Sequence, residues 1–163
     1  MDRTECFIPP DGVLPPCDER IAALHRYWRS LWPAGGGLPG RKDFDPAAVP
    51  DLLPWIWMLD VHRDPLRFKY RLLGTGQVAI IGRDRTGAWI DEQVPNFFDA
   101  PAFRHYAAVA EQGLVCYRRG FPVVHVPKDF MLLERIFLPL AKDGRKVDII
   151  LALTLYYPAG NSD

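Results

Sequence analysis

Charged side chains inside otherwise apolar segments are the first candidates for chemistry in this chain. Asp60 interrupts the apolar run Trp55–Val61, and Glu134 and Arg135 are adjacent within the run Met131–Leu140. Side chains of consecutive strand residues point to opposite faces of a sheet, so one of these two charges is expected to face the apolar side. An inward charge needs a partner, because an unpaired buried charge costs several kcal/mol.

These charges have two interpretations. One is a structural ion pair that holds the sheet together, with Asp60 as the first choice of partner for Arg135. Truncating one member of such a buried pair is expected to cost about 3–5 kcal/mol. The other is a polar anchor inside a ligand pocket, in which Arg135 would bind a carboxylate. Arg71 and Glu134 belong to the same candidate set.

The histidines and cysteines do not have the spacing of a metal site. No two histidines are four residues apart, and no cysteine lies near one at ligand spacing. The chain also lacks the G-x-S-x-G, P-loop and H-E-x-x-H motifs. We therefore predict no metal and assign no catalytic residue. The residues considered are His25, His62, His105, His125, Cys6, Cys17 and Cys116.

The glycine pattern Gly74-x-Gly76-x-x-Ala79 resembles a dinucleotide-binding fingerprint, because it follows a strand and opens a helix. Asp91 and Glu92 even follow at about the distance of a ribose-binding acid. However, the preceding strand carries Lys69 and Arg71, whereas a buried parallel strand should be almost entirely apolar. We favour a tight turn that uses the freedom of glycine at positive φ.

Aromatic residues are numerous, and most are expected in the core. A pocket built from the same side chains is the alternative interpretation. The set comprises Trp55, Trp57, Tyr70, Phe97, Phe98, Phe103 and Tyr106. A second apolar group forms a stripe with helical spacing, which could pack on its own sheet or against a second subunit. It comprises Ile21, Leu24, Tyr27, Trp28, Leu31 and Trp32.

The hydrophobic periods predict an α+β domain with an antiparallel sheet, because no alternation of strand and helix appears. Helices are expected from the Asp18 cap to Trp32, from a Pro46 turn capped by Asp45, and over Gln77–Ile81 and Ala102–Gln112. Strands are expected over Trp55–Val61, Phe68–Leu73, Cys116–Val126, Met131–Leu140 and Lys146–Tyr157, with a hairpin turn at Asp143-Gly144. Residues 1–17 are expected to be a flexible, proline-rich arm, 18–36 an amphipathic helix, and 37–163 the main domain.

Composition excludes several classes of function. The 163 residues have a net charge of zero, 48% hydrophobic and 25% charged content, which is ordinary for one globular domain. No charge surplus attracts nucleic acid or an anionic membrane. Acidic residues and prolines at the start argue against a signal peptide, and three cysteines without C-x-x-C indicate reduced thiols. A cytoplasmic location is expected.

The order of these elements resembles the PAS sensory fold, in its compact bacterial form. The matching segments are LHRYWRSL at 24–31, LPGRKDFDP at 38–46, LLPWIWMLDV at 52–61, FKYRLLGTG at 68–76, IIGRDRTG at 80–87 and ERIFLPLAKDGRKVD at 134–148. The resemblance implies a five-stranded antiparallel sheet with short helices on one face. A ligand would lie between them, in a pocket that includes Trp57, Tyr70, Phe98 and Tyr106. It also implies a sensing or scaffold role.

The resemblance gives no reason to expect a cofactor. Flavin photosensors of this superfamily carry a reactive cysteine in the segment that corresponds here to residues 82–85, which has none. Haem sensors use a histidine on a pocket helix, for which His105 is the one candidate, and a haem site also needs a shaped apolar cavity.

We therefore expect a non-enzymatic sensory or interaction domain that binds a small molecule or a partner protein and signals in trans. The alternative is a small α+β cone-fold isomerase or cyclase, in which Asp60 or His125 acts as a base in an apolar pocket. A third is an orphan module whose pocket is filled by side chains. A homodimer is also expected, with Tyr27, Trp28, Leu31 and Trp32 at the interface.

Overall fold

A six-stranded antiparallel sheet forms the centre of the computed structural model, which describes residues 3–122 and 131–158. The strand order is β1-β4-β5-β6-β2-β3. The strands are β1 (Thr4–Ile8), β2 (Ile56–His62), β3 (Arg67–Leu73), β4 (Val115–Gly120), β5 (Met131–Leu140) and β6 (Ile149–Pro158). The prediction of an α+β fold with an antiparallel sheet is confirmed, including the β2–β3 hairpin beside β6.

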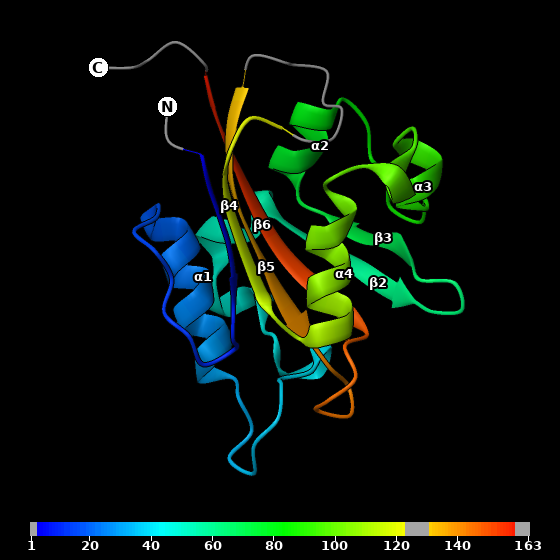
Figure 1. The fold of residues 1–163 in the computed structure, drawn as a ribbon. Helices are drawn as coiled ribbons and strands as arrows, with labels where there is room; N and C mark the ends of the chain where they lie inside the picture. Colours follow the sequence, from blue (N-terminus) through cyan, green and yellow to red (C-terminus); the bar gives the residue numbers. More distant parts are fainter. Residues whose placement is uncertain (1–2, 123–130, 159–163) are drawn as a thin grey trace.

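Helices lie on both faces of the sheet (Figure 1). Helix α1 (Glu19–Ser30) covers one face, and α2 (Thr75–Ile81), α3 (Ile90–Gln93) and α4 (Phe103–Gln112) cover the other. Short 3-10 helices connect them: η1 (Arg41–Asp43), η2 (Pro46–Ala48), η3 (Pro50–Trp55) and η4 (Phe97–Asp99). None of the helices among the described residues is long and apolar enough to cross a membrane.

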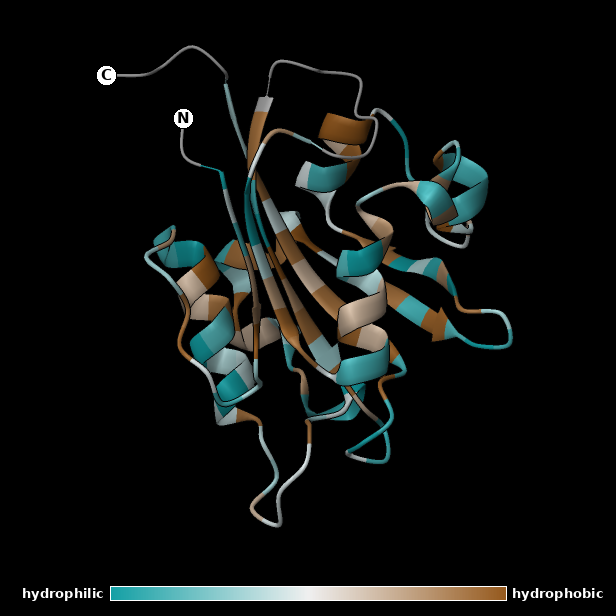
Figure 2. Cartoon of the chain, viewed as in Figure 1, coloured by the Kyte–Doolittle hydropathy of each residue, from teal (hydrophilic) through white to brown (hydrophobic). Residues whose placement is uncertain are grey.

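Side chains along each strand alternate between the two faces of the sheet, and each face has its own hydrophobic core. In β6, Leu151 and Leu153 belong to the core under α1, while Ile150 and Ala152 belong to the core under α2–α4. A strand buried on both faces reads as a continuous apolar run, as β6 does. Figure 2 shows apolar residues concentrated along these central strands.

The proline-rich arm is the first correction. Residues Thr4–Ile8 form β1, which pairs antiparallel with β4 from Thr4 opposite Arg119 to Ile8 opposite Val115. The expected five strands are therefore six, and this part of the arm is not flexible. A five-residue strand at an edge has too few alternating positions to be identified from its own sequence. The predicted strand Cys116–Val126 ends at Gly120, and residues 123–126 lie outside the described part.

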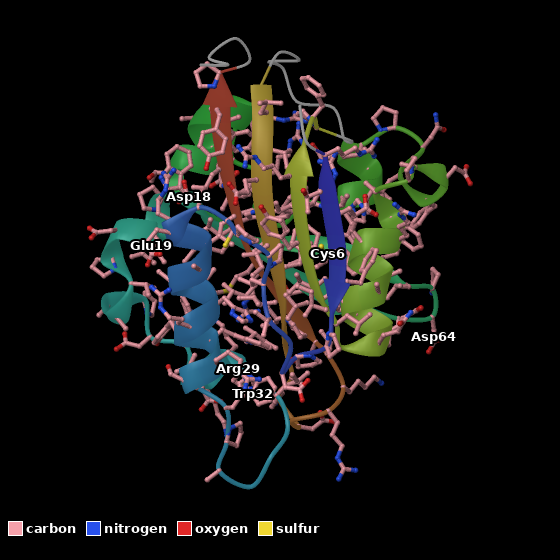
Figure 3. All side chains as sticks on the ribbon, turned by 60° about the vertical axis from the view of Figure 1, so that its left-hand side comes forward. Cys6, Asp18, Glu19, Arg29, Trp32 and Asp64 are labelled. Carbon is pink, nitrogen blue, oxygen red and sulfur yellow. The ribbon has the colours of Figure 1, made fainter. Side chains whose placement is uncertain are left out.

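Helix α1 forms where its capping signals predict. Asp18 is the N-cap and accepts a hydrogen bond from the backbone nitrogen of Arg20 at 2.9 Å. Glu19 lies in the first turn and Arg29 in the last, so both charges complement the helix dipole. Figure 3 shows these side chains at the two ends of α1, with Cys6 on the neighbouring β1.

The apolar stripe of α1 packs on its own sheet. Trp28 is 0% exposed, and its indole Nε1 donates to the carbonyl oxygen of Pro139 at 3.0 Å. The expectation that Trp28 lies at a dimer interface is therefore wrong, because its surface is already covered within the chain. Tyr27, Leu31 and Trp32 remain half-buried.

We expect Trp28→Ala to lower the free energy of unfolding by about 3–5 kcal/mol, because it removes a fully buried indole and leaves a cavity. Trp32→Ala is the matched control, since Trp32 lies one turn later and is half-buried; its loss should be clearly smaller. Urea unfolding followed by circular dichroism measures both. Equal losses would contradict the packing described for α1.

Candidate functional site

A small inner cavity lies between the sheet and helices α2–α4. It has a volume of about 50 Å³. Its walls come from β2, β3, α2, the segment before α3, α4, β5 and β6. The lining residues are Trp57, Tyr70, Leu73, Gln77, Ile81, Arg85, Val94, Tyr106, Leu133, Arg135, Thr154 and Tyr156. These described lining residues include two arginines, Arg85 and Arg135, but no Asp or Glu.

Glycines bring α2 close to the chain before β2. A Cβ on Gly74 would lie 2.3 Å from the carbonyl oxygen of Leu53, and one on Gly76 would lie 2.7 Å from the Trp55 ring. Gly74 has φ −62°, so the expected reason, freedom at positive φ, is wrong for it. Close backbone approach is the reason instead. The preceding strand β3 is antiparallel to its neighbour β2, so the dinucleotide interpretation does not hold.

Gln77 fixes α2 against the sheet. Its Nε2 donates to the carbonyl oxygens of Trp55 at 2.7 Å and Thr154 at 2.8 Å, and its Oε1 accepts from the hydroxyl of Tyr156 at 3.0 Å. Trp57 Nε1 donates to Thr154 Oγ1 at 2.9 Å. These polar groups therefore satisfy one another and shape one wall of the cavity without needing a ligand.

Arg135, in contrast, lines the cavity without a full set of hydrogen-bond partners among the described residues. The residue is 3% exposed, and its Nη2 lies 2.9 Å from Nδ1 of His105. Its guanidinium carbon lies 4.2 Å from the centre of the Phe137 ring. Its Nε is buried and has no hydrogen-bond partner among the described residues. The same holds for Nε of Arg85.

His105 joins Arg135 to the edge strand β1. Its Nε2 lies 3.2 Å from Oε1 of Glu5, and Arg104 pairs with the same carboxylate. Burial, and then the positive charge of Arg135, lower the pKa of His105 to about 4. His105 is therefore neutral at pH 7 and accepts a hydrogen bond from Arg135.

Glu134 lies on the opposite face, although it is adjacent to Arg135 in sequence. It is 2% exposed. Its Oε1 accepts from the backbone nitrogen of Asp18 at 2.8 Å and from the hydroxyl of Tyr117 at 2.9 Å, and its Oε2 accepts from the hydroxyl of Tyr157 at 3.2 Å. The carboxylate thus fastens the N-terminus of α1 to the sheet.

The predicted pairing of Asp60 with Arg135 is wrong. Asp60 pairs instead with Arg71, at 3.1 Å between Oδ1 and Nη1. Neither residue lines the inner cavity. The error arose because only one face of the sheet was expected to be buried. Both faces are buried, so Glu134 and Arg135 each find local partners across a strand or on a helix.

Of the predicted pocket residues, Trp57, Tyr70, Tyr106 and Arg135 line the cavity. Phe98 does not, because it is 47% exposed on η4. Sequence reasoning missed Arg85 and the β6 residues Thr154 and Tyr156. The register could have shown the β6 pair: Thr154 lies directly opposite Arg135, so residues two apart on β6 share its face. Arg85 had no comparable signal, because it lies in an irregular glycine-rich segment.

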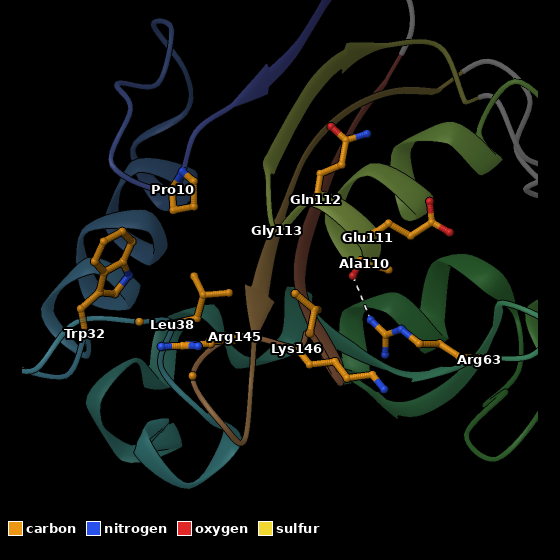
Figure 4. A pocket seen from close by; sticks show the side chains of 13 residues that line it. Pro10, Trp32, Leu38, Arg63, Ala110, Glu111, Gln112, Gly113, Arg145 and Lys146 are labelled. Carbon is orange, nitrogen blue, oxygen red and sulfur yellow. Dashed lines mark hydrogen bonds between the residues drawn. The ribbon is translucent and has the colours of Figure 1, made fainter.

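A second, larger cleft opens at the other end of the sheet (Figure 4). It has a volume of about 590 Å³ and is lined by Trp32, the end of α4 and the β5–β6 turn. Arg63, Arg145 and Lys146 line it with one acid, Glu111. Arg63 donates to the carbonyl oxygen of Ala110 at 2.9 Å. Although this cleft is larger, its turn cations Arg145 and Lys146 are exposed, whereas Arg135 in the inner cavity is buried.

Residues 3–122 and 131–158 contain no cluster of side chains that could bind a metal ion. No three His, Cys, Asp or Glu side chains there are placed to hold an ion together. His125, one of the two bases in the enzyme hypothesis, lies outside the described residues.

Comparison with known proteins identifies the family. The profile of the PAS domain family matches residues 18–154, which is most of the chain. The chain therefore belongs to the PAS domain family, a class of sensory and interaction domains, as the sequence resemblance predicts. Searches of the curated proteins and of the solved structures gave no match.

We expect Glu134→Ala to lower the free energy of unfolding by at least about 2 kcal/mol, because it leaves buried donors of Tyr117 and Asp18 without an acceptor. Glu134→Gln should cost much less, since its amide oxygen still accepts and its nitrogen can donate to Tyr157. Glu111→Ala, at an exposed site, is the control. Equal unfolding midpoints for the two Glu134 variants in urea would contradict this role.

The free energy of unfolding should also decrease as the pH is lowered from about 6.5 to about 4. In this window His105 takes up a proton in the unfolded chain, where its pKa is about 6.5, but not in the folded one. The unfolded state therefore binds more protons, and the free energy of unfolding decreases as pH falls, by on the order of 2–3 kcal/mol. Half-buried His25, whose pKa burial also lowers, adds to the slope.

Urea unfolding at several pH values measures this slope. His105→Gln should flatten it, whereas His62→Gln, at an exposed histidine, should leave it unchanged. A wild-type slope retained in His105→Gln would show that another group carries the pH dependence.

Proposed function

We propose that this PAS domain binds a small molecule in the inner cavity and passes the resulting change to a partner. One observation carries the proposal: the nearly fully buried Arg135 lines a cavity between the sheet and helices α2–α4, and its buried Nε has no hydrogen-bond partner among the described residues. Buried polar groups are normally hydrogen-bonded, so such an exception calls for an explanation, and a ligand supplies one.

A path from the cavity to the outer surface supports the signalling part of the proposal. Arg135 contacts His105, and His105 contacts Glu5 on β1. An occupant that attracts Arg135 would alter this contact. Among the described strands β1 is five residues long and pairs with one neighbour, so its attachment is easier to change than that of a central strand.

Interaction with a partner protein is a second candidate function, supported by the larger cleft. Its three cations against one acid favour an acidic segment of a partner. Self-association remains a proposal of the same kind. The half-buried Tyr27, Leu31 and Trp32 are the α1 residues that could take part, and sedimentation of the wild-type protein tests it.

The enzyme alternative has less support. PAS domains are generally non-enzymatic. Asp60 was proposed as a base in an apolar pocket, but it pairs with Arg71 outside the inner cavity. The described residues therefore offer this base no enclosed site for a substrate.

Filling the inner cavity tests the proposed function. Ile81 lines the cavity from α2, whereas the adjacent Ile80 does not. We expect Ile81→Trp to abolish the rise in melting temperature caused by small molecules that stabilise the wild type, and Ile80→Trp to retain it. Scanning fluorimetry across a library of short acids, amides, alcohols and amines, together with native mass spectrometry of the purified protein, provides the measurement. If Ile81→Trp responds like the wild type, the inner cavity is not the binding site.

A further inference from the structure

The inner cavity contains an excess of positive charge. Arg135 and Arg85 both line it, and each has a buried Nε without a partner in the described part of the chain. No ion pair within 4.0 Å joins either guanidinium to a carboxylate among those residues. A buried cation without a counter-charge is costly, so this arrangement favours an anion that enters from outside.

A neighbouring arginine increases this excess. Arg118 on β4 lies directly opposite Arg135 on β5 and is 1% exposed. Burial, and then the charge of Arg135, lower the pKa of Arg118 to about 10, so it remains charged at pH 7. The carboxylate that acts on Arg118 is Glu5, which is already shared by Arg104 and His105. One carboxylate therefore does not balance the cations on this face.

Neutral donors surround the same space. Burial raises the pKa of Tyr70, Tyr106 and Tyr156, that of Tyr156 to about 12. These hydroxyls stay protonated at neutral pH and do not repel an anion. The hydroxyl of Tyr156 already donates to Gln77, so Tyr70 and Tyr106 are the tyrosines that could donate to an anion. The wall thus offers two guanidinium groups and tyrosine hydroxyls, but no carboxylate that would compete.

The size and the apolar walls limit the anion. A water-sized group occupies about 10–15 Å³ of such a volume, so the cavity of about 50 Å³ holds roughly three to five non-hydrogen atoms. Leu73, Ile81, Val94 and Leu133 provide apolar wall. A planar guanidinium matches the two oxygens of a carboxylate, and the apolar side chains suit a short carbon tail better than a fully polar oxyanion.

We infer that the inner cavity binds a short-chain monocarboxylate of roughly two or three carbons, with its carboxylate held by Arg135 and Arg85 and its tail against Leu133 and Ile81. The inference rests on the proposed function, since it specifies the ligand of the same cavity. Arg135 supplies the buried charge, and Arg85 completes the clamp from the segment between α2 and α3.

Matched pairs of probes test the class of ligand. Sodium acetate and sodium propionate are compared with acetamide and propionamide, and with sodium nitrate and phosphate, at constant ionic strength and pH 7. Isothermal calorimetry should give saturable binding of propionate with a Kd between tens of micromolar and about a millimolar, the range open to so small a ligand. Propionamide, which has the same shape but no charge, should bind at least tenfold more weakly.

Substitutions identify the residues. Arg85→Gln should weaken propionate binding about tenfold or more, while Arg83→Gln, two residues away on an exposed side chain, should leave the Kd unchanged. Arg135→Lys keeps the charge but loses the planar fork, so it should also weaken binding. Arg135→Gln should bind least. If it does not fold, Arg85→Gln and Arg135→Lys still decide the matter.

The outcomes separate this inference from the proposed function. Binding of amides or alcohols that is lost in Ile81→Trp, with no response to carboxylates, would overturn the carboxylate assignment and leave the cavity as a ligand site. Binding of nitrate or phosphate more tightly than propionate would also overturn it. No response to any compound would overturn both. Unchanged propionate affinity in Arg85→Gln and Arg135→Lys would show that these residues do not hold the carboxylate.

Discussion

The burial of β5 on both faces is the constraint on which the rest of this structure depends. Two consecutive residues, Glu134 and Arg135, carry opposite charges, are both almost fully buried, and point to opposite sides. The sheet therefore cannot slip by one residue without exchanging a carboxylate and a guanidinium between two differently built environments. Each charge is matched to its own side: hydroxyl and backbone donors surround Glu134, whereas His105 accepts from Arg135.

The two faces consequently have different tasks. Under α1 the polar groups satisfy one another, since the Glu134 carboxylate accepts from Asp18 and two tyrosines and holds the helix cap in place. Under α2–α4 the balance is incomplete, because Arg135 and Arg85 keep buried nitrogens without partners in the described residues. A satisfied network rigidifies a core, while an unsatisfied one stores a cost that a ligand can relieve. The face under α1 is therefore the one whose buried polar groups are satisfied, and the face under α2–α4 is the one that the proposed ligand would complete.

Much of the fold was predictable from local signals, whereas the site was predictable only in part. Caps such as Asp18 and Asp45, the stop at Gly82 and the period-two runs place α1, η2, α2, β2 and β3 within two residues, whereas β1 and α3 were not predicted and the strand predicted to begin at Lys146 begins at Ile149. Four of the eight predicted pocket residues line the cavity. Strand alternation accounts for Trp57, Tyr70 and Arg135, whereas Tyr106 lies on α4. The partner of Arg135 was not predictable, since His105 reaches it only through the packing of α4 on the sheet, and Glu5 reaches His105 only through the pairing of β1, which no local pattern encodes.

The strand β1 connects these observations. It is short and pairs with β4 alone among the described strands, so its position depends on that pairing and on the contacts of Glu5 with Arg104 and His105. The same His105 accepts from Arg135 in the cavity wall. An anion that draws the Arg135 guanidinium toward itself would weaken its bond to His105. It would also offset the charge of Arg135, which adds to burial in lowering the pKa of His105. His105 lies 3.2 Å from Glu5, so occupation of the cavity would change the surroundings of a contact that holds the edge strand.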